Sequence, residues 1–391
     1  MRKILFAAIS LSFIIGSAQK IEFVKKLPFP DSIVSSELTM SLHNNHLVAS
    51  ILSVNPNAAK PTYRTIIMES DNLGNSWSIR NEILAEEAAD PWVTMLDDDQ
   101  FIFTDISEGN RFHLKSFANI NGKWQPPISH GLGHDYATSL SDSGSHYIFS
   151  TQKVGPNMVL YVHKTENGAS ISQSIEVFNG ADISFKKPVL VNDQIAIPVV
   201  LRGSWDGKSS TYFNQMTSWL LMLDKQSLSA STPSLITNLS GAKHHILVKG
   251  NDKLFYFYTD VERKELKVVA SSDLGKSWGY SKLVAKSAHL LNLDAATWLK
   301  DQVVVVFTDE ESEGSFQKYV WSMNQEMETL NRIRLGALSR PDQRNGWVIR
   351  AWPQGGDYCG MVPSESGELY IMWSAAPDGI FNPYFAKISL K

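Results

Sequence analysis

The feature of this sequence that most constrains its fold is a sevenfold repeat, in which a polar turn precedes a short apolar strand. The repeat occurs as "NNHLVASIL" (44–52), "DDDQFIFTDI" (97–106), "SGSHYIFST" (143–151), "NDQIAIPVV" (192–200), "NDKLFYFYT" (251–259), "KDQVVVVFT" (300–308) and "SGELYIMWS" (366–374). The apolar strands start at Leu47, Phe101, Tyr147, Ile195, Leu254, Val303 and Leu369, which gives spacings of 54, 46, 48, 59, 49 and 66 residues. A period of roughly 40–50 residues with four strands per unit is typical of a β-propeller.

We therefore predict an all-β fold, a seven-bladed β-propeller whose last blade is completed by the N-terminal strand "KIEFVKKL" (20–27). The repeated strands are apolar on both faces, as expected where neighbouring blades cover both. The predicted blades cover 35–80, 89–127, 134–178, 183–231, 242–284, 289–335 and 356–391, with insertions at 203–216 and 336–355. The alternative is a β-sandwich followed by an unrelated β domain.

The first 18 residues predict a signal peptide. Arg2 and Lys3 precede the apolar run "ILFAAISLSFII" (4–15), and small residues follow up to Ala18. The run is too short to span a membrane, so we expect cleavage near Ala18 and a secreted or periplasmic protein, with residues 19–391 forming a single propeller domain.

The bulk composition excludes several classes of protein. Cys359 is the only cysteine, so an intrachain disulfide and a thiolate metal cluster are both impossible. The net charge is −4 and no long basic run occurs, so neither a nucleic acid nor a membrane is an expected partner. We predict no metal and no cofactor, and we expect a monomer because a closed propeller leaves few exposed edges.

Two turns carry a further motif. "SSDLGKSW" (271–278) matches Ser-x-Asp-x-Gly-x-Ser/Thr-Trp at every specified position, and "SDNLGNSW" (70–77) matches it with Asn72 in place of Asp. The sequence thereby resembles the Asp-box (BNR-repeat) β-propeller superfamily. That resemblance implies outer hairpins, so we interpret Asp273 and Asn72 as residues that form turns and not as catalytic acids.

Within the Asp-box propellers, the sequence is similar to two groups of enzymes to different degrees. Sialidases bind a carboxylate with three arginines, one of them in a Phe/Tyr-Arg-Ile-Pro motif, and they resemble six-bladed propellers. The nearest string here is "YRTIIMES" (63–70), which lacks Ile-Pro after Arg64. The sequence more closely resembles seven-bladed polysaccharide lyases of the ulvan lyase type, in which His and Tyr act as base and acid and Arg neutralises the acid group.

Candidate site residues follow from the strand order, because loops that start the innermost strand and loops that leave the second strand lie on one face. β-Elimination at a uronic acid needs a base, a proton donor for the leaving oxygen, and a cation for the carboxylate. We predict His134 as the base, Tyr136 as the acid and Arg202 as the cation. The predicted substrate-binding residues are His244, His245, Lys186 and Tyr358.

The leading hypothesis is thus a secreted lyase that cleaves an anionic, uronate-containing, ulvan-like polysaccharide. A second hypothesis is a sialidase-like exo-glycoside hydrolase, which needs two carboxylates; the candidates are Asp105, Asp260, Asp309 and Asp357. A third is a non-catalytic propeller that binds a glycan or a protein through Trp205 or Trp352 in the two insertions.

Overall fold

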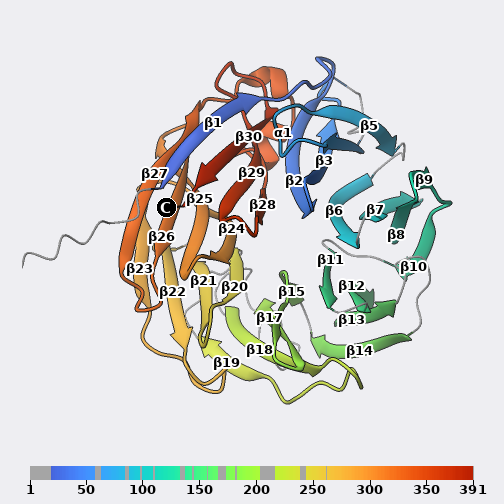
Figure 1. The fold of residues 1–391 in the computed structure, drawn as a ribbon, viewed down its shortest axis with the longest axis vertical. Helices are drawn as coiled ribbons and strands as arrows, with labels where there is room; N and C mark the ends of the chain where they lie inside the picture. Colours follow the sequence, from blue (N-terminus) through green and yellow to red (C-terminus); the bar gives the residue numbers. More distant parts are fainter. Residues whose placement is uncertain are drawn as a thin grey trace, which may run out of the picture.

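The described residues form seven blades arranged around a central axis, five of them with four strands and two with five (Figure 1). The structure is a computed structural model, and it describes residues 19–57, 63–83, 88–96, 99–108, 111–132, 137–142, 145–155, 157–165, 173–180, 183–202, 216–237, 244–260 and 262–390. Each blade is antiparallel. In the first six blades the strands follow one another outward from the axis in chain order, whereas the outermost strand of the seventh is β1. The prediction of an all-β, seven-bladed propeller is confirmed. The predicted signal peptide lies outside the described residues and stays a prediction.

The first four blades each begin with an innermost strand and end near the rim. Blade one holds β2 (Val34–His43), β3 (His46–Val54), β4 (Tyr63–Ser70) and β5 (Ser78–Ile83). Blade two holds β6 (Ala88–Leu96), β7 (Asp99–Glu108), β8 (Arg111–Ile120), β9 (Lys123–Trp124) and β10 (Ile128–Leu132). Blade three holds β11 (Thr138–Asp142), β12 (Ser145–Val154), β13 (Asn157–Thr165) and β14 (Gln173–Gly180). Blade four holds β15 (Ile183–Phe185), β16 (Val189–Val191), β17 (Gln194–Arg202), β18 (Met216–Asp224) and β19 (Ser234–Thr237).

The last three blades follow the same plan. Blade five holds β20 (His245–Lys249), β21 (Leu254–Asp260), β22 (Glu265–Ser271) and β23 (Lys282–Lys286). Blade six holds β24 (Leu291–Leu299), β25 (Gln302–Ser312), β26 (Ser315–Met323) and β27 (Thr329–Ser339). Blade seven holds β28 (Gly360–Pro363), β29 (Glu368–Ala375), β30 (Asn382–Ser389) and β1 (Lys20–Lys26).

Strand β1 closes the ring, as the sequence predicts. It pairs antiparallel with β30, from Lys20 opposite Ser389 to Lys26 opposite Tyr384. The side chain of Phe23 reaches inward, and its ring centroid lies 6.0 Å from that of Phe385. The two ends of the chain therefore share one sheet, and β1 covers the edge that β30 would otherwise expose.

The core lies between the blades, and β25 shows why a continuous apolar run is needed. Val303 and Val305 pack with the cluster shared by blades five and six, whereas Val304 and Val306 pack with the cluster shared by blades six and seven. All four side chains are fully buried. Burying one valine contributes about 1.5–3 kcal/mol, so a strand buried on both faces is a large part of what holds adjacent blades together.

The two turns with the repeated motif have the same hydrogen bonds. In the turn after β22, the backbone N–H of Gly275 donates to Oγ of Ser271 across 2.7 Å, and the N–H of Ser277 donates to Asp273 across 2.8 Å. In the turn after β4, Gly74 and Ser76 make the matching bonds to Ser70 and Asn72 at 2.8 Å each. Both turns join the third strand of a blade to its fourth, and so lie at the rim of the ring.

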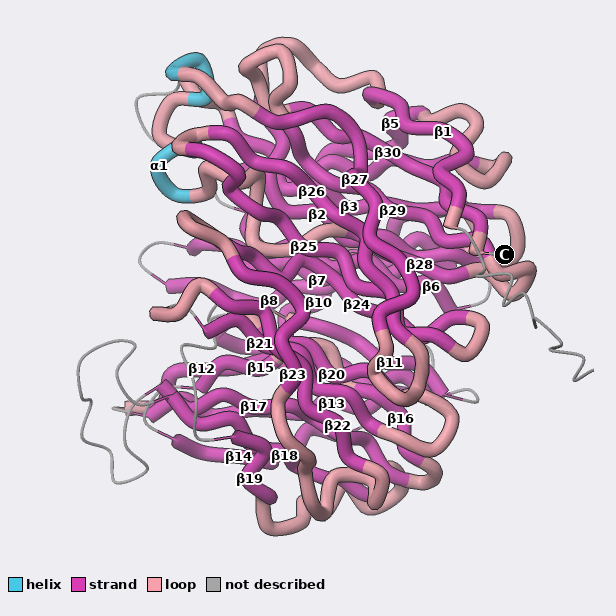
Figure 2. The backbone as a smooth tube through the Cα atoms, turned by 90° about the vertical axis from the view of Figure 1, so that its left-hand side faces the viewer, coloured by secondary structure: helices cyan, strands magenta, loops and turns pink. Residues whose placement is uncertain are grey.

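The insertion between blades six and seven contains the helical segments η1 (Gln343–Asn345) and α1 (Val348–Ala351). Figure 2 shows both on one face of the ring. Trp347 packs edge-on against Tyr63 of blade one at 5.5 Å, so the insertion bridges the junction between the last and first blades. None of the helices in the described chain has the length and apolar character needed to span a membrane. Most of the other insertion, 203–215, lies outside the described residues.

Candidate functional site

The innermost strand of blade one contains a β-bulge that carries Glu37. Ser35 pairs with Ser53 and Leu38 pairs with Ile51, so three steps along β2 oppose two steps along β3. In a regular innermost strand the side chains alternate between the two neighbouring blades. One extra residue interrupts this alternation and redirects a side chain, as β-bulges commonly do beside functional sites.

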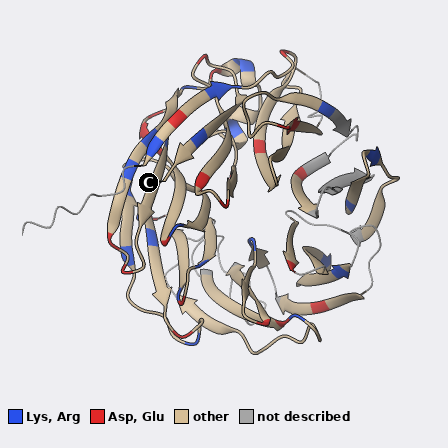
Figure 3. Cartoon of the chain, viewed as in Figure 1, with Lys and Arg blue, Asp and Glu red and all other residues tan. Residues whose placement is uncertain are grey.

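The same irregularity recurs in two other innermost strands, each time beside an acidic residue. In β6 the register shifts between Ala89 and Trp92, and Asp90 lies within the shift with a φ of 49°. In β24 the register shifts between Leu293 and Ala295, which flank Asp294. Figure 3 shows acidic positions on the innermost strands of blades one and two. Each of these bulges therefore lies beside an acidic residue on an innermost strand.

Blade four brings cations to the axis in a similar way. Its innermost strand is broken into β15 and β16, with Lys186, Lys187 and Pro188 between them. Phe185 pairs with Val199 and Val189 pairs with Ala196, so the break contains one residue more than the opposing strand. Proline has no backbone N–H to continue the ladder, which favours a bulge at this position.

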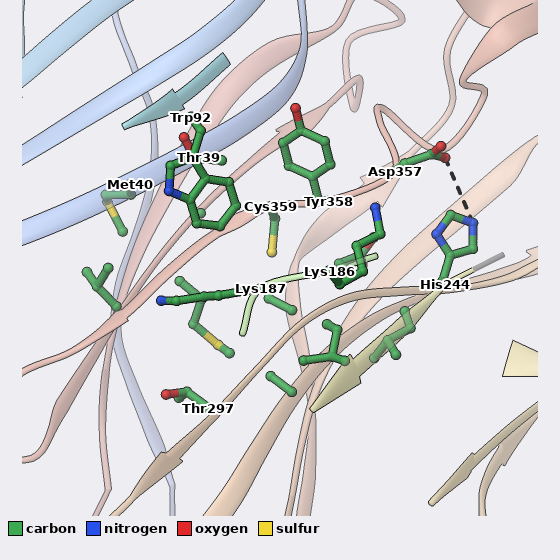
Figure 4. Close-up of a pocket in the computed structure, with 18 of the residues that line it drawn as sticks. Thr39, Met40, Trp92, Lys186, Lys187, His244, Thr297, Asp357, Tyr358 and Cys359 are labelled. Carbon is green, nitrogen blue, oxygen red and sulfur yellow. Dashed lines mark ion pairs between the residues drawn. The ribbon is translucent and has the colours of Figure 1, made fainter. Parts of the chain in front are cut away.

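Lys186, Lys187 and Asp294 line a cavity of about 160 Å³ on the propeller axis (Figure 4). A cavity of roughly 150 Å³ holds a six-membered ring. Its polar lining includes Lys186, Lys187, His244, Asp357 and Tyr358. The cavity also has an aromatic wall, Trp92, and an aliphatic wall formed by Met40, Ile246, Leu293, Ala295 and Met361. Convergent polar groups between apolar walls are typical of a binding site for a small molecule or one sugar unit.

His244 and Asp357 form the charged pair of the cavity. Nε2 of His244 lies 3.9 Å from Oδ1 of Asp357, and Figure 4 marks this contact. Oδ1 of Asp357 also accepts a hydrogen bond from Nε2 of Gln354 across 3.1 Å. A carboxylate beside an imidazole orients the ring and stabilises its protonated form, which is the arrangement used for proton transfer.

The two lysines in the cavity have different surroundings. Nζ of Lys186 lies 5.9 Å from the ring centroid of Tyr358, and its charge also acts on Glu37. Nζ of Lys187 lies 6.0 Å from the ring centroid of Trp92, and the side chain is exposed to the cavity. Burial inside the ring lowers the pKa of Lys187. No carboxylate of the described chain forms an ion pair with Lys187, so its charge has no protein counter-ion there.

Behind the cavity wall, the surroundings of the Glu37 carboxyl group favour its neutral form. Its side chain is 3% exposed, and Oε1 accepts a hydrogen bond from the backbone N–H of Asp357 across 3.3 Å. Burial is the largest cause that raises the pKa of Glu37 well above its usual range. The negative charges of Asp90 and Asp357 and a hydrogen bond with Asp90 add to the effect, and Lys186 opposes it.

Asp294 lines the cavity but is already engaged by other groups. Its carboxylate accepts hydrogen bonds from Nζ of Lys318 across 2.8 Å, from Thr308 across 2.7 Å and from Asn292 across 2.6 Å. Asn292 also donates to the carbonyl of Asp357 across 3.3 Å. This buried network therefore supports the loop that contains Asp357, just before β28 (the Asp357 loop). The carboxylate of Asp294 is not available to a substrate.

The four predicted substrate-binding residues, His244, His245, Lys186 and Tyr358, all line this one cavity. His134 and Tyr136 lie outside the described residues, and Arg202 is placed only as the last residue of β17. The structure thus does not test the predicted catalytic set, which stays a prediction.

Of the carboxylates considered for hydrolysis, Asp260 and Asp309 do not line the cavity. Asp260 pairs with Lys267 at 3.3 Å, and Asp309 lies 3.9 Å from Arg332. Only Asp357 of that group belongs to the cavity, and the side chain of Asp105 is not described.

Glu37, Asp90 and Asp294 are absent from the sequence-based prediction of the site. A signal for such residues was nevertheless present, because an ionisable residue lies at a nearly fixed distance before several of the polar turns. Glu37 lies seven residues before Asn44, and Lys186, His244 and Asp294 lie six residues before Asn192, Gly250 and Lys300.

Comparison with known proteins shows the fold. No family model matches the chain, and no curated protein matches it by sequence. The endosialidase of phage phi92 is similar in structure, with a TM-score of 0.58 and 10% identity over 94% of this chain and 69% of that chain. The acylaminoacyl peptidase of Pyrococcus horikoshii has a TM-score of 0.51 and 10% identity over 92% of this chain and 52% of that one. At these identities the likeness extends to the propeller alone.

Proposed function

We propose that this propeller cleaves an acidic polysaccharide by β-elimination in the axial cavity. The observation that carries the proposal is the set of groups that share this cavity: a histidine beside a carboxylate, a tyrosine, and a lysine that forms no ion pair with the carboxylates that the structure describes. One protein with the same fold is an endosialidase, so the fold is compatible with action on a carbohydrate.

Each step of the elimination has a group in the cavity. Lys187 pairs with the carboxylate of a uronate and stabilises the negative charge that develops when the neighbouring C5–H bond breaks. His244 takes that proton, and Asp357 stabilises the resulting imidazolium. The C4–O bond then breaks as the C4–C5 double bond forms, and the hydroxyl of Tyr358 donates its proton to the departing oxygen. The aromatic face of Trp92 offers an apolar surface for a sugar ring.

A second candidate function is hydrolysis, and the acidic group of Glu37, Asp90 and Asp357 is the observation that favours it. A carboxyl group with a raised pKa, such as Glu37, is what a glycosidase uses to protonate its leaving group. Glu37 does not line the cavity, however, and Asp294 is already paired with Lys318. The cavity lining contains no arginine among the described residues, whereas sialidases are expected to use three.

The deciding experiment follows two products at once. The protein from Gln19 onward is incubated with ulvan, polygalacturonate, alginate and hyaluronan, and both ultraviolet absorbance and reducing ends are measured. Elimination produces a double bond conjugated to the carboxylate, so the two signals rise together. His244→Asn abolishes the rise, whereas the control His289→Asn, an exposed histidine, does not. Reducing ends without absorbance mean hydrolysis, and neither signal means a propeller that binds without cleaving.

A further inference from the structure

We propose that Glu37, in its uncharged form, is a positioning residue that holds Asp357 beside His244, and that ionisation of Glu37 disables the site at high pH. This inference rests on the proposed function, because it assigns a role in catalysis to the pair of His244 and Asp357. Glu37 itself lies behind the cavity wall and touches no substrate.

The Asp357 loop rests directly on Glu37. The backbone N–H of Asp357 donates to Oε1 of Glu37, and the preceding residue, Gly356, has a φ of +123°. A Cβ atom at Gly356 would lie 3.0 Å from Cγ of Glu37 and 3.1 Å from its backbone nitrogen. Only glycine allows so close an approach in this conformation. Gly356 therefore allows the backbone of Asp357 to contact Glu37.

Two amide side chains of the described residues also hold Asp357, and neither titrates. Gln354 donates to Oδ1 across 3.1 Å, and Asn292 donates to the backbone carbonyl across 3.3 Å. Glu37 is therefore the one ionisable group among these three supports. A change in its charge alters the position of Asp357, whereas the two amides are indifferent to pH.

The charged groups around Glu37 make its ionisation unfavourable. Asp90 on β6 and Asp357 before β28 are acidic, and Lys186 between β15 and β16 is the basic group that faces them. A negative charge on Glu37 would therefore add a third anion beside Asp90 and Asp357, opposed by the charge of Lys186. Repulsion then acts on Asp357. Its Oδ1 is already 3.9 Å from Nε2 of His244, so a small movement breaks the contact between the two side chains.

The test uses Glu37→Gln, because glutamine keeps an acceptor oxygen and stays neutral at every pH. The ring signals of His244, assigned with His244→Asn, are followed by NMR between pH 5 and pH 10 in protein labelled at histidine. In the wild type we expect a second inflection above the titration of the imidazole itself, caused by Glu37. In Glu37→Gln this upper inflection disappears, and in the control Glu365→Gln, an exposed turn residue, it remains.

A second variant shifts the upper inflection of His244 and does not remove it. Asp90→Asn removes one of the charges that raise the pKa of Glu37, so the upper inflection of His244 shifts to lower pH. The same shifts appear in the upper limb of the pH–rate profile on whichever substrate is cleaved. Identical His244 titrations in wild type, Glu37→Gln and Asp90→Asn overturn the inference, as does loss of turnover in Glu37→Gln at every pH.

The two proposals fail separately. If His244→Asn retains full turnover, the proposed function is wrong, yet the NMR titration still reports whether Glu37 controls the environment of His244. If His244→Asn is inactive while the His244 titration is the same in the wild type and Glu37→Gln, the proposed function stands and the positioning role is rejected.

Discussion

Glu37 and Asp357 are 320 positions apart in sequence, and a 3.3 Å hydrogen bond between them joins the first blade to the last behind the wall of the axial cavity. The contact depends on closure of the ring, because it joins β2 to the loop before β28. The same junction contains the bond between the hydroxyls of Ser35 and Ser374, at 2.8 Å. The site is therefore assembled only when the two ends of the chain have met.

Removal of the charge of Lys187 is expected to weaken substrate binding most for acidic sugars. Lys187→Met eliminates the cation that has no ion pair in the described chain, so kcat/KM on a uronate polymer falls at least about 100-fold. Lys187→Arg restores part of the loss because it keeps the charge. Lys276→Met, at an exposed turn, is the matched control. Equal activity of Lys187→Met and the wild type would exclude a role for this cation.

Three buried histidines are expected to make the protein acid-sensitive. Burial lowers the pKa of His130, His146 and His163 to about 4, below the usual value of 6.5. The unfolded chain then binds more protons, so the free energy of unfolding falls as the pH drops from about 6.5 to about 4, by up to about 3 kcal/mol per histidine. Denaturant titrations at several pH values measure this slope.

One substitution separates the histidine effect from general acid denaturation. His146→Gln removes one of the three groups, so its unfolding free energy depends less on pH than that of the wild type. His289→Gln, at an exposed histidine, leaves the slope unchanged. A slope that is the same in all three proteins would assign the acid sensitivity to other groups.

Two glycines with positive φ provide a test of the motif turns. A Cβ atom at Gly275 would lie 2.1 Å from Cδ2 of Leu220, whereas a Cβ atom at Gly122 would have no neighbour within 4 Å. Both have positive φ, +91° and +76°, so each alanine variant has a backbone cost of about 1 kcal/mol. Gly275→Ala must also displace Leu220, so we expect its melting temperature to fall clearly below that of Gly122→Ala. Equal losses would mean that the turn does not fix the adjacent blade.

The buried pair of Asp294 and Lys318 is expected to be costly to break from one side. The side chains are 1% and 8% exposed, so Lys318→Met leaves a buried carboxylate without its cation, at a cost of about 3–5 kcal/mol. Adding Asp294→Asn removes the unpaired charge and recovers part of the loss. Urea unfolding of the two single variants and the double variant measures the coupling. Simple additivity would contradict a direct interaction.

The seven blades, the closing strand and the rim turns can be predicted from the sequence alone, because each depends on the local pattern of apolar and turn-forming residues. The run of valines at 303–306 predicts a strand buried on both faces, and the structure has one there. The glycine of each motif turn has the positive φ that the motif requires. Lys186, His244, His245 and Tyr358 could be placed at the axis because strand order alone sends the start of each innermost strand to one face.

Which charged residues meet depends on how the blades are arranged in space. Glu37, Asp90 and Asp294 lie within strands whose regular alternation would direct them to a neighbouring blade, and the register shifts appear only when the paired strand is known. The contact of Glu37 with Asp357 and the position of Lys187 in the axial cavity likewise depend on distances between blades far apart in the chain. An apolar pattern acts over a few residues. A bulge depends on the pairing of its strand with the next, and the charged groups it meets depend on how the blades close into a ring.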